Sequence, residues 1–415
     1  MVFTIDKFAL LKQYFGHSEF RPGQETLIDA LLSGRDVLGV MPTGAGKSIC
    51  YQLPALLLPG LTLVVSPLIS LMKDQVTALS QTGISSAYIN SSLTSDQYRE
   101  VFRRAKNGVY KIIYVAPERL TAIDFLRFAE ETEISLLAVD EAHCVSQWGQ
   151  DFRPSYLKIT EFVSSLSRRP AVGAFTATAT AVVKADIEKL LLLQNPLHIT
   201  TGFDRPNLYF EVMRPKSKET YLRAFLNERP GQSGIVYCAT RKTVESVCDS
   251  LRQNGVAATR YHAGLEDAER KQNQEDFVYD RSRVMIATNA FGMGIDKSNV
   301  SFVVHYNMPK NIESYYQEAG RAGRDGEKAY CALLFSAGDI QTAKFLINNA
   351  EENEALSADE QELVRKRDIQ RLDQMVAYCK TTDCLRAYLL DYFGENAAIN
   401  CGNCGNCIEE MVQIG

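Results

Sequence analysis

The sequence lacks any apolar run as long as a membrane span, which needs about 20 residues, and it contains no low-complexity tract or short-period repeat. Its N-terminus has no basic region followed by a long apolar core, so no secretory signal is expected and the cytoplasm is the predicted location. In that compartment the 10 cysteines should be reduced or bound to metal rather than paired in disulfides.

A strong charge of either sign is also missing, since the formal net charge is −5 and the pI is near 5.7. This balance counts against a protein that binds nucleic acid through a broad basic surface. It does not exclude local binding of the nucleic-acid backbone by backbone amides, hydroxyls and a few arginines. With 415 residues, 46% of them hydrophobic and 23% charged, the chain is expected to be globular with two or three domains.

Tryptophan occurs once, and the segment around it, residues 140–156, reads Asp-Glu-Ala-His-Cys-Val-Ser-Gln-Trp-Gly-Gln-Asp-Phe-Arg-Pro-Ser-Tyr. The apolar run 136–139 before it predicts a buried parallel strand. Two carboxylates at the end of such a strand, here Asp140 and Glu141, are how phosphate-loop ATPases hold Mg²⁺ and position the attacking water.

Aromatic side chains and an arginine follow in the same polar loop: Trp148, Phe152, Arg153 and Tyr156. Stacking of bases on such aromatics is typical of proteins that bind single-stranded nucleic acid. The alternative, that Trp148 only packs against another part of the protein, stays open. The segment is therefore predicted to join ATP chemistry to a nucleic-acid contact.

The segment 41–48, Met-Pro-Thr-Gly-Ala-Gly-Lys-Ser, follows one apolar run and precedes a helical stretch. In such a loop, backbone N–H groups and the positive end of the helix dipole face phosphate. Lys47 is expected to reach the β- and γ-phosphates, and Ser48 to bind Mg²⁺. The strict pattern has glycine at position 41. The predicted phosphate-binding residues are Thr43, Gly44, Ala45, Gly46, Lys47 and Ser48.

Short apolar runs alternate with helical stretches, which predicts α/β layers with mostly parallel sheets. The first series of expected strands lies at residues 36–40, 61–66, 111–115, 136–139 and 172–176. Residues 204–207, Asp-Arg-Pro-Asn, interrupt the pattern. The second series is expected at residues 234–238, 283–288, 302–306 and 329–335. It has no glycine-lysine loop, so nucleotide is expected in a cleft between two lobes. From residue 337 the composition is helical and charged.

Two arginines, Arg321 and Arg324, stand three residues apart among small residues. On a helix they would share a face and could act as arginine fingers that neutralise charge on the transferring phosphoryl group. A surface arginine pair is the alternative. Thr288 and Asp296 flank a glycine-containing loop after a strand, where Thr288 is expected to bind backbone phosphate and Asp296 ribose. A tight turn accounts for that loop nearly as well.

Three cysteines at two-residue gaps, Cys401, Cys404 and Cys407, have the spacing that wraps a metal ion. Cys384 is the natural fourth ligand, since Cys379 lies further off, and a closed structural zinc site is predicted. An iron–sulfur cluster and free cysteines remain as alternatives. The other five cysteines are expected in buried packing: Cys50, Cys144, Cys238, Cys248 and Cys331.

Over essentially its whole length the sequence resembles superfamily 2 helicases and, within them, the RecQ DNA helicases. The matching segments are residues 20–24 (Phe-Arg-Pro-Gly-Gln), the phosphate loop, 140–143, the loop to Tyr156, 176–178 (Thr-Ala-Thr), 317–324 and the cysteine cluster. The resemblance implies an α/β fold of two RecA-like parallel-sheet lobes, residues 1–203 and 204–338, and a small helical zinc-binding subdomain, residues 339–415. Relatives usually add a winged-helix domain and often a further helical domain. Because the sequence continues eight residues past Cys407, neither is expected in it.

The resemblance also implies roles for single residues. Gln24 would hydrogen-bond adenine, Arg21 would assist, and His17 would stack where a tyrosine often sits. Gln317 would join Arg321 and Arg324 in the catalytic set. Gln150 stands where a histidine is common.

The expected activity is DNA-stimulated ATP hydrolysis, with 3′→5′ translocation on single-stranded DNA and unwinding of tailed duplex DNA, in DNA repair and recombination. ATP, Mg²⁺ and Zn²⁺ are the expected cofactors. Asp140 and Ser48 would hold Mg²⁺, while Glu141 would orient or deprotonate water. Two alternatives remain: an RNA helicase, which Trp148 and the cysteines argue against, and a remodelling factor that binds ATP without unwinding.

Overall fold

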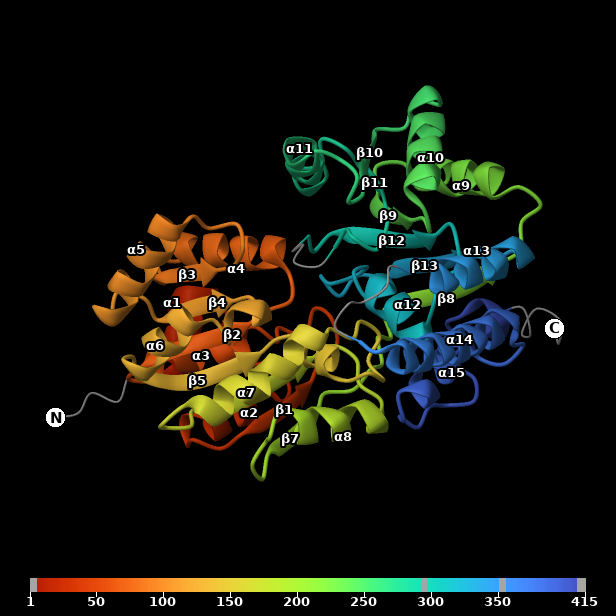
Figure 1. The fold of residues 1–415 in the computed structure, drawn as a ribbon. Coiled ribbons are helices and arrows are strands. Elements are labelled where there is room, and N and C mark those ends of the chain that lie inside the picture. Colours follow the sequence, from red (N-terminus) through yellow and green to blue (C-terminus); the bar gives the residue numbers. More distant parts are fainter. Residues whose placement is uncertain (1–5, 293–296, 351–355, 409–415) are drawn as a thin grey trace. The chain divides into compact units, whose positions relative to one another are not determined.

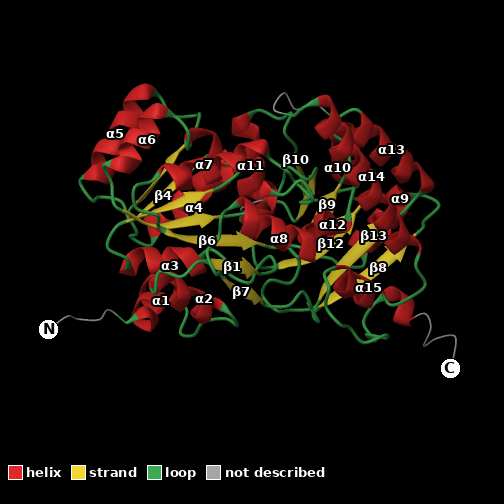
Figure 2. Cartoon of the chain, turned by 60° about the horizontal axis from the view of Figure 1, so that its bottom comes forward, coloured by secondary structure: helices red, strands yellow, loops and turns green. Residues whose placement is uncertain are grey.

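The computed structural model describes residues 6–292, 297–350 and 356–408. Contacts between residues divide the chain into two units, Met1–Gly202 and Phe203–Gly415. Each unit is built around one parallel sheet that is flanked by helices (Figures 1 and 2). None of the described helices is long and apolar enough to cross a membrane.

Seven parallel strands form the sheet of the first unit, in the order β3-β4-β2-β5-β6-β1-β7. The register aligns carboxyl ends: Val65 pairs with Val115 and Val139, and Val40 pairs with Thr176. The loops that follow these strands therefore meet at one edge, where α/β sheets bind ligands. The strands are β1 (Val37–Val40), β2 (Leu61–Val65), β3 (Ser86–Ile89), β4 (Ile112–Val115), β5 (Ile134–Val139), β6 (Ala171–Thr176) and β7 (Leu197–Thr200).

Helices cover both faces of this sheet (Figure 2). They are α1 (Lys7–Phe15), α2 (Gln24–Leu32), α3 (Ile49–Leu57), α4 (Ile69–Gln81), α5 (Ser95–Lys106), α6 (Ile123–Glu130), α7 (Lys158–Ser165) and α8 (Ala181–Leu190). Three short 3₁₀ turns also occur, at Pro117–Arg119, Ala142–Val145 and Pro154–Leu157.

A buried carboxylate fixes the start of β1, the strand that leads to the phosphate loop. Asp36 accepts hydrogen bonds from the backbone N–H groups of Val172 at 2.8 Å and Gln194 at 2.7 Å. The guanidinium of Arg169 pairs with the same carboxylate, with Nη2 at 2.6 Å from Oδ2. A buried charge is tolerated when it is paired and hydrogen-bonded in this way, so β1 is held beside β6.

Six parallel strands form the sheet of the second unit, in the order β10-β11-β9-β12-β13-β8. They are β8 (Leu208–Met213), β9 (Ser233–Tyr237), β10 (Ala258–Tyr261), β11 (Val284–Ala287), β12 (Val300–His305) and β13 (Ala329–Leu334). The helices of this part are α9 (Lys218–Asn227), α10 (Arg241–Gln253), α11 (Asp267–Val278) and α12 (Ile312–Ala319).

A helical region completes the second unit, with α13 (Ala337–Asn348), α14 (Ala358–Lys380) and α15 (Leu385–Tyr392). Ser357 and Glu360 form a capping box at the start of α14, which satisfies backbone N–H groups that have no partner within the helix. Beyond α15, Cys404 forms a parallel bridge with Phe210 of β8, so this region covers part of the outer edge of the sheet.

All nine strands expected from the sequence are present. Four further strands were not expected, and they are the outermost strands of the two sheets: β3, β7, β8 and β10.

Candidate functional site

The phosphate loop, residues 42–48, joins β1 to the N-terminus of α3. Gly44 and Gly46 have φ values of 88° and 78°, a conformation that glycine adopts without steric penalty. A Cβ on Gly46 would also lie 2.5 Å from Nε2 of Gln24. Ser48 immediately precedes α3, where backbone N–H groups and the helix dipole favour phosphate.

Met41 stands where the strict phosphate-loop pattern has glycine, and the structure gives the reason. Its backbone N–H donates to the carbonyl of Thr176 at 2.9 Å, which extends the pairing of β1 with β6 by one residue. Its side chain is buried, with Sδ at 3.7 Å from Sγ of Cys50. Its carbonyl accepts a hydrogen bond from Nζ of Lys47 at 3.4 Å. Position 41 therefore belongs to the core and tolerates a side chain.

Gln24 and Arg21, which the resemblance assigns to adenine, contact the phosphate loop. The amide nitrogen of Gln24 donates to the carbonyls of residues 45 and 46 at 3.1 and 3.0 Å, and its oxygen accepts from the backbone N–H of Arg21 at 2.9 Å. Nη1 of Arg21 donates to the carbonyl of Gly44. His17 is exposed, two residues beyond α1. Binding of adenine by these three residues stays a prediction.

Asp140 and Glu141 follow the last residue of β5. Asp140 is buried, and its backbone N–H donates to the carbonyl of Val65 at 2.9 Å. Burial, and next the charge of Glu141, raise the pKa of Asp140 to about 7, while the charge of Lys47 lowers it. A nearby cation stabilises such a carboxyl group as its anion. Carboxylate and hydroxyl oxygens, as on Asp140 and Ser48, are donors that suit Mg²⁺.

Glu141 has a left-handed backbone conformation, with φ 48° and ψ 47°, which costs on the order of 1 kcal/mol for a residue with a Cβ. It turns the chain from β5 into the 3₁₀ turn Ala142–Val145. The hydroxyl of Tyr156 supports this turn by donating to the carbonyl of Asp140 at 2.9 Å. The expectation that Tyr156 belongs to a base-stacking surface is wrong, because its side chain is wholly buried.

His143 connects the carboxylates to a neighbouring strand and to the loop. Its Nδ1 lies 2.9 Å from Oγ1 of Thr176 and 3.4 Å from Oε2 of Glu141, and its Nε2 lies 3.5 Å from Nε2 of Gln150. Because Oγ1 of Thr176 donates to the carbonyl of Thr178 at 3.0 Å, it accepts from a proton on Nδ1, which leaves the lone pair of Nε2 for the Gln150 amide. A displacement of Gln150 would therefore be transmitted to Glu141 through the imidazole ring of His143.

The outer part of the loop carries the predicted nucleic-acid contacts. Trp148 is 42% exposed and Phe152 is partly exposed. Nη1 of Arg153 donates to the carbonyl of Pro67 at 2.8 Å, and its Nε and Nη2 donate to Asp151 at 3.0 and 2.8 Å. Arg153 thus ties this loop to the loop that follows β2, a connection the sequence did not reveal.

The two arginines of the second unit do not lie on a helix, so the prediction that they share a helical face is wrong. Helix α12 ends at Ala319, and Gly323, with φ 58°, lies in the turn that follows. Arg321 is buried and its Nη1 donates to the carbonyl of Gly292. Arg324 is partly exposed.

Two further predicted site residues of the second unit, Gln317 and Thr288, lie in the described part of the chain. Gln317 lies within α12. The hydroxyl of Thr288 accepts from the backbone N–H of Ala290 at 3.4 Å, a contact that favours the local-turn account. Asp296 lies outside the described residues. Because these residues belong to the second unit and the phosphate loop to the first, their approach to bound phosphate stays a prediction.

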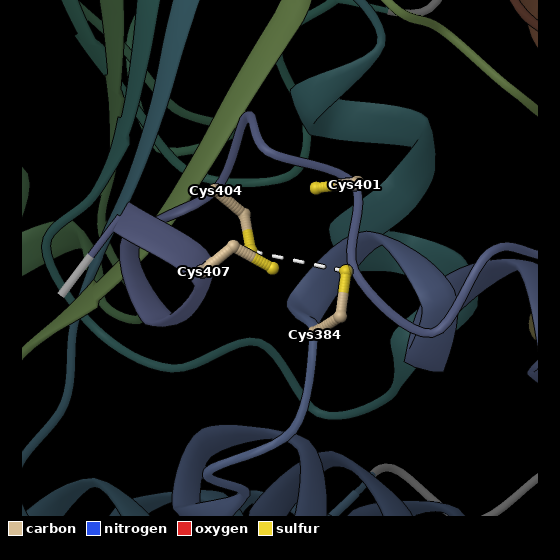
Figure 3. A group of neighbouring side chains, drawn as sticks. All are labelled: Cys384, Cys401, Cys404 and Cys407. Atoms are coloured by element: carbon tan, nitrogen blue, oxygen red, sulfur yellow. Dashed lines mark hydrogen bonds between the residues drawn. The ribbon is translucent and has the colours of Figure 1, made fainter. Parts of the chain in front are cut away.

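Four cysteines converge in the helical region: Cys384, Cys401, Cys404 and Cys407 (Figure 3). Their Sγ atoms all lie within 4.8 Å of one another, and those of Cys384 and Cys404 are 3.9 Å apart. Four thiolates around one tetrahedral zinc ion are separated by roughly 3.8 Å, so the group fits a single ion. An iron–sulfur cluster places its thiolates around several metal atoms, which needs a wider arrangement.

Backbone N–H groups support these thiols. Sγ of Cys384 accepts from Ala387 at 3.4 Å, and Sγ of Cys401 accepts from Asn403 at 3.3 Å. Burial acts to raise the pKa of Cys384, but hydrogen bonds from the Ala387 amide and from neighbouring cysteines lower it overall, whereas burial raises the pKa of Cys401 and Cys407. Cys379 is buried outside this group, as are the five cysteines expected in packing.

Three family descriptions match consecutive parts of the chain: "DEAD/DEAH box helicase" over residues 21–185, "Helicase conserved C-terminal domain" over 217–326 and "RecQ zinc-binding" over 337–408. The last match falls on the region that brings the four cysteines together. The chain belongs to the RecQ family of superfamily 2 helicases. Its first sheet carries the phosphate loop and the acidic strand end, and its second unit carries the arginines and the cysteine cluster.

The ATP-dependent DNA helicase RecQ of Bacillus subtilis is 48% identical over 402 residues, which cover 97% of this chain and 66% of that protein. A relative from Acanthamoeba polyphaga mimivirus, named provisionally as an ATP-dependent RNA helicase, is 42% identical over 96% of this chain and 71% of its own. This RecQ core spans 62 to 66% of the length of the first three curated relatives.

A solved structure of the helicase MrfA bound to DNA shares the fold, with a TM-score of 0.68 and 18% identity, over 97% of this chain and 60% of that one.

Gly149 has no room for a side chain, since a Cβ would lie 2.1 Å from the carbonyl oxygen of His143. Gly149→Ala must therefore displace the loop beside Trp148. Because Trp148 is the only tryptophan, its fluorescence reports on this loop alone, and we expect Gly149→Ala to shift its emission maximum. Gly338→Ala is the control, because the nearest atom to its Cβ would be Oγ of Ser336 at 3.8 Å. An unchanged emission spectrum in Gly149→Ala would contradict the tight packing of the loop.

Proposed function

We propose that this RecQ core hydrolyses ATP with Mg²⁺ when single-stranded DNA is bound, translocates 3′→5′ and unwinds tailed duplex DNA. The observation that carries the proposal is the arrangement at the end of β5. One strand end holds Asp140 and Glu141 and continues directly into the loop that exposes Trp148. The proposed cellular roles, DNA repair and recombination, rest on the family resemblance.

In the proposed reaction, backbone N–H groups of residues 44–48 bind the phosphates, and Lys47 neutralises charge on the β- and γ-phosphates. Asp140 and Ser48 would hold Mg²⁺, which would supply charge neutralisation on the transferring group. Glu141 orients the attacking water or takes its proton. Arg321 and Arg324 stabilise the charge that builds in the transition state.

DNA is proposed to act on this reaction through His143. A base stacked on Trp148 contributes about 1–3 kcal/mol, which is enough to hold the loop in one arrangement. Gln150 and the loop backbone then fix the imidazole of His143, whose Nδ1 lies 3.4 Å from the Glu141 carboxylate. Glu141 therefore acquires its working geometry when the loop is ordered by DNA.

The four cysteines are proposed to bind one structural zinc ion. Four thiolates leave no open coordination position for catalysis, and the segment they hold covers the outer edge of β8 through Cys404 and Phe210. Asn406 also anchors this segment, because its Nδ2 donates to the carbonyls of Thr381 and Asp383 at 3.1 and 2.7 Å.

An RNA helicase is the second candidate, because the mimivirus relative carries that name. The B. subtilis relative is named as a DNA helicase at higher identity, and the family of this chain is RecQ. We therefore propose DNA as the nucleic-acid substrate and keep RNA as the second candidate.

Strand displacement on a duplex with a single-stranded 3′ tail tests the proposed function. We expect ATP-dependent unwinding of the 3′-tailed duplex and little unwinding of 5′-tailed or blunt duplexes. Glu141→Gln keeps the shape of the side chain but removes the base, so ATP should still bind while hydrolysis falls by roughly 10²–10⁴-fold and unwinding stops. Near-native hydrolysis by Glu141→Gln with saturating DNA would contradict the role given to the end of β5.

Trp148→Ala tests the coupling between DNA and hydrolysis. The ATPase rate without DNA should stay near that of the parent chain, while the maximal stimulation by single-stranded DNA should fall sharply. Phe345→Ala, which removes another exposed aromatic side chain (64% exposed), should leave stimulation unchanged. If Trp148→Ala reached full stimulation and only needed more DNA to do so, Trp148 would contribute to binding alone.

Cys404→Ser tests the metal site. Metal-binding free energy is folding free energy in such sites, so this variant should lose its metal and unfold at a lower temperature. Elemental analysis of the parent chain should find about one zinc ion per chain. Cys379→Ala, which changes a buried cysteine outside the group, should keep its zinc. A coloured protein that contains iron would contradict the zinc assignment.

A further inference from the structure

His305 is a buried titratable residue that the proposed mechanism does not use. It is the last residue of β12, and its Nε2 lies 2.9 Å from Oε2 of Glu318. Its ring stacks on Tyr237, with ring centroids 5.5 Å apart, and packs at a tilt against Tyr315 at 4.9 Å. Glu318 belongs to the last turn of α12, so this pair ties that turn to a central strand of the sheet. Figure 1 shows α12 beside β12.

The contact between His305 and Glu318 is buried inside the second unit. Nδ1 is buried and has no hydrogen-bond partner in the described part of the chain. The ring therefore contacts the carboxyl group of Glu318 through Nε2. The side chain of Glu318 is therefore held by a ring that is itself packed against Tyr237 and Tyr315.

Glu318 stands three residues before Arg321, and the backbone N–H of Arg321 donates to its carbonyl at 3.2 Å. On the other side, Nη1 of Arg321 donates to the carbonyl of Gly292, and the hydroxyl of Tyr237 donates to the carbonyl of Phe291 at 3.1 Å. Burial raises the pKa of Tyr237 to about 12, the charge of Arg321 opposes this and the charge of Glu318 adds to it. Tyr237, on which His305 stacks, is therefore within electrostatic reach of both Arg321 and Glu318.

Arg321 lies in the turn that follows α12, so its position depends on how the last turn of this helix is held. Helix α12 ends at Ala319, and Gly320 and Gly323 flank the arginine. An arginine side chain loses about 2 kcal/mol of rotamer entropy when it is fixed. Stabilisation of a transition state depends on donors that are in place before charge develops.

We propose that His305 and Glu318 are positioning residues for Arg321, because they anchor the last turn of α12 and so preorganise the arginine for ATP hydrolysis. This inference rests on the proposed function. A pair that only stabilises the fold would instead affect folding without acting through Arg321.

Glu318→Ala removes the contact with His305, and alanine still favours the helical conformation of α12. With DNA at saturation we expect kcat for ATP hydrolysis to fall by roughly 10–100-fold, the range that a small misplacement of a reacting group produces, and KM for ATP to stay within about twofold. Glu318→Gln keeps an oxygen that accepts from Nε2 of His305 and should retain most of kcat.

Tyr392→Phe is the matched control. It removes a hydrogen bond of 2.7 Å to Glu313 in the first turn of the same helix, at the end opposite to Arg321, and should leave kcat unchanged. Thermal unfolding of each variant shows that the compared proteins are folded.

The deciding measurement adds Glu318→Ala to Arg321→Ala. If Glu318 acts through Arg321, the double variant should be no slower than Arg321→Ala, since residues that act as a unit are not additive. If the two losses multiply, or if only KM changes, the positioning role is refuted while the proposed function stands. A parent chain that does not hydrolyse ATP at all would instead refute the proposed function and this inference with it.

Discussion

The turn at the end of β5 is the constraint on which the site depends. It places a buried carboxyl group, Asp140, beside a residue in left-handed conformation, Glu141. This conformation persists only because the surroundings fix it: the Tyr156 hydroxyl donates to the carbonyl of Asp140, and His143 lies between Glu141 and Thr176. The contacts that hold these two carboxyl groups also hold the start of the exposed loop, so movement of one is expected to disturb the other.

The sheets show which part of the fold could be predicted from sequence. Central strands such as β5 and β9 are buried on both faces and therefore read as continuous apolar runs. The four strands that were missed are the edges of the sheets, and each has residues that are not fully buried, as in β7 with alternating partly exposed and exposed positions. An edge strand has one neighbour and needs less apolar surface, so its sequence resembles that of a loop.

The candidate site was predictable where backbone chemistry dictates residue type, as at Gly44 and Gly46 and in the spacing of the cysteines. Contacts between residues distant in sequence were not predictable. Neither Tyr156 supporting Asp140 nor Arg153 reaching the carbonyl of Pro67 has a local signal. The prediction of a helix for the two arginines was wrong for a local reason, because α12 ends at Ala319 and is capped by Gly320.

The central claim is that one strand end couples nucleic acid to ATP hydrolysis. The most direct test is the steady-state rate of Mg²⁺-dependent ATP hydrolysis by the parent chain, measured against the concentration of a single-stranded DNA and of an RNA of the same sequence. The account predicts a low rate without nucleic acid, a large saturable increase with DNA and a smaller one with RNA. A rate that is the same with and without either strand would contradict it.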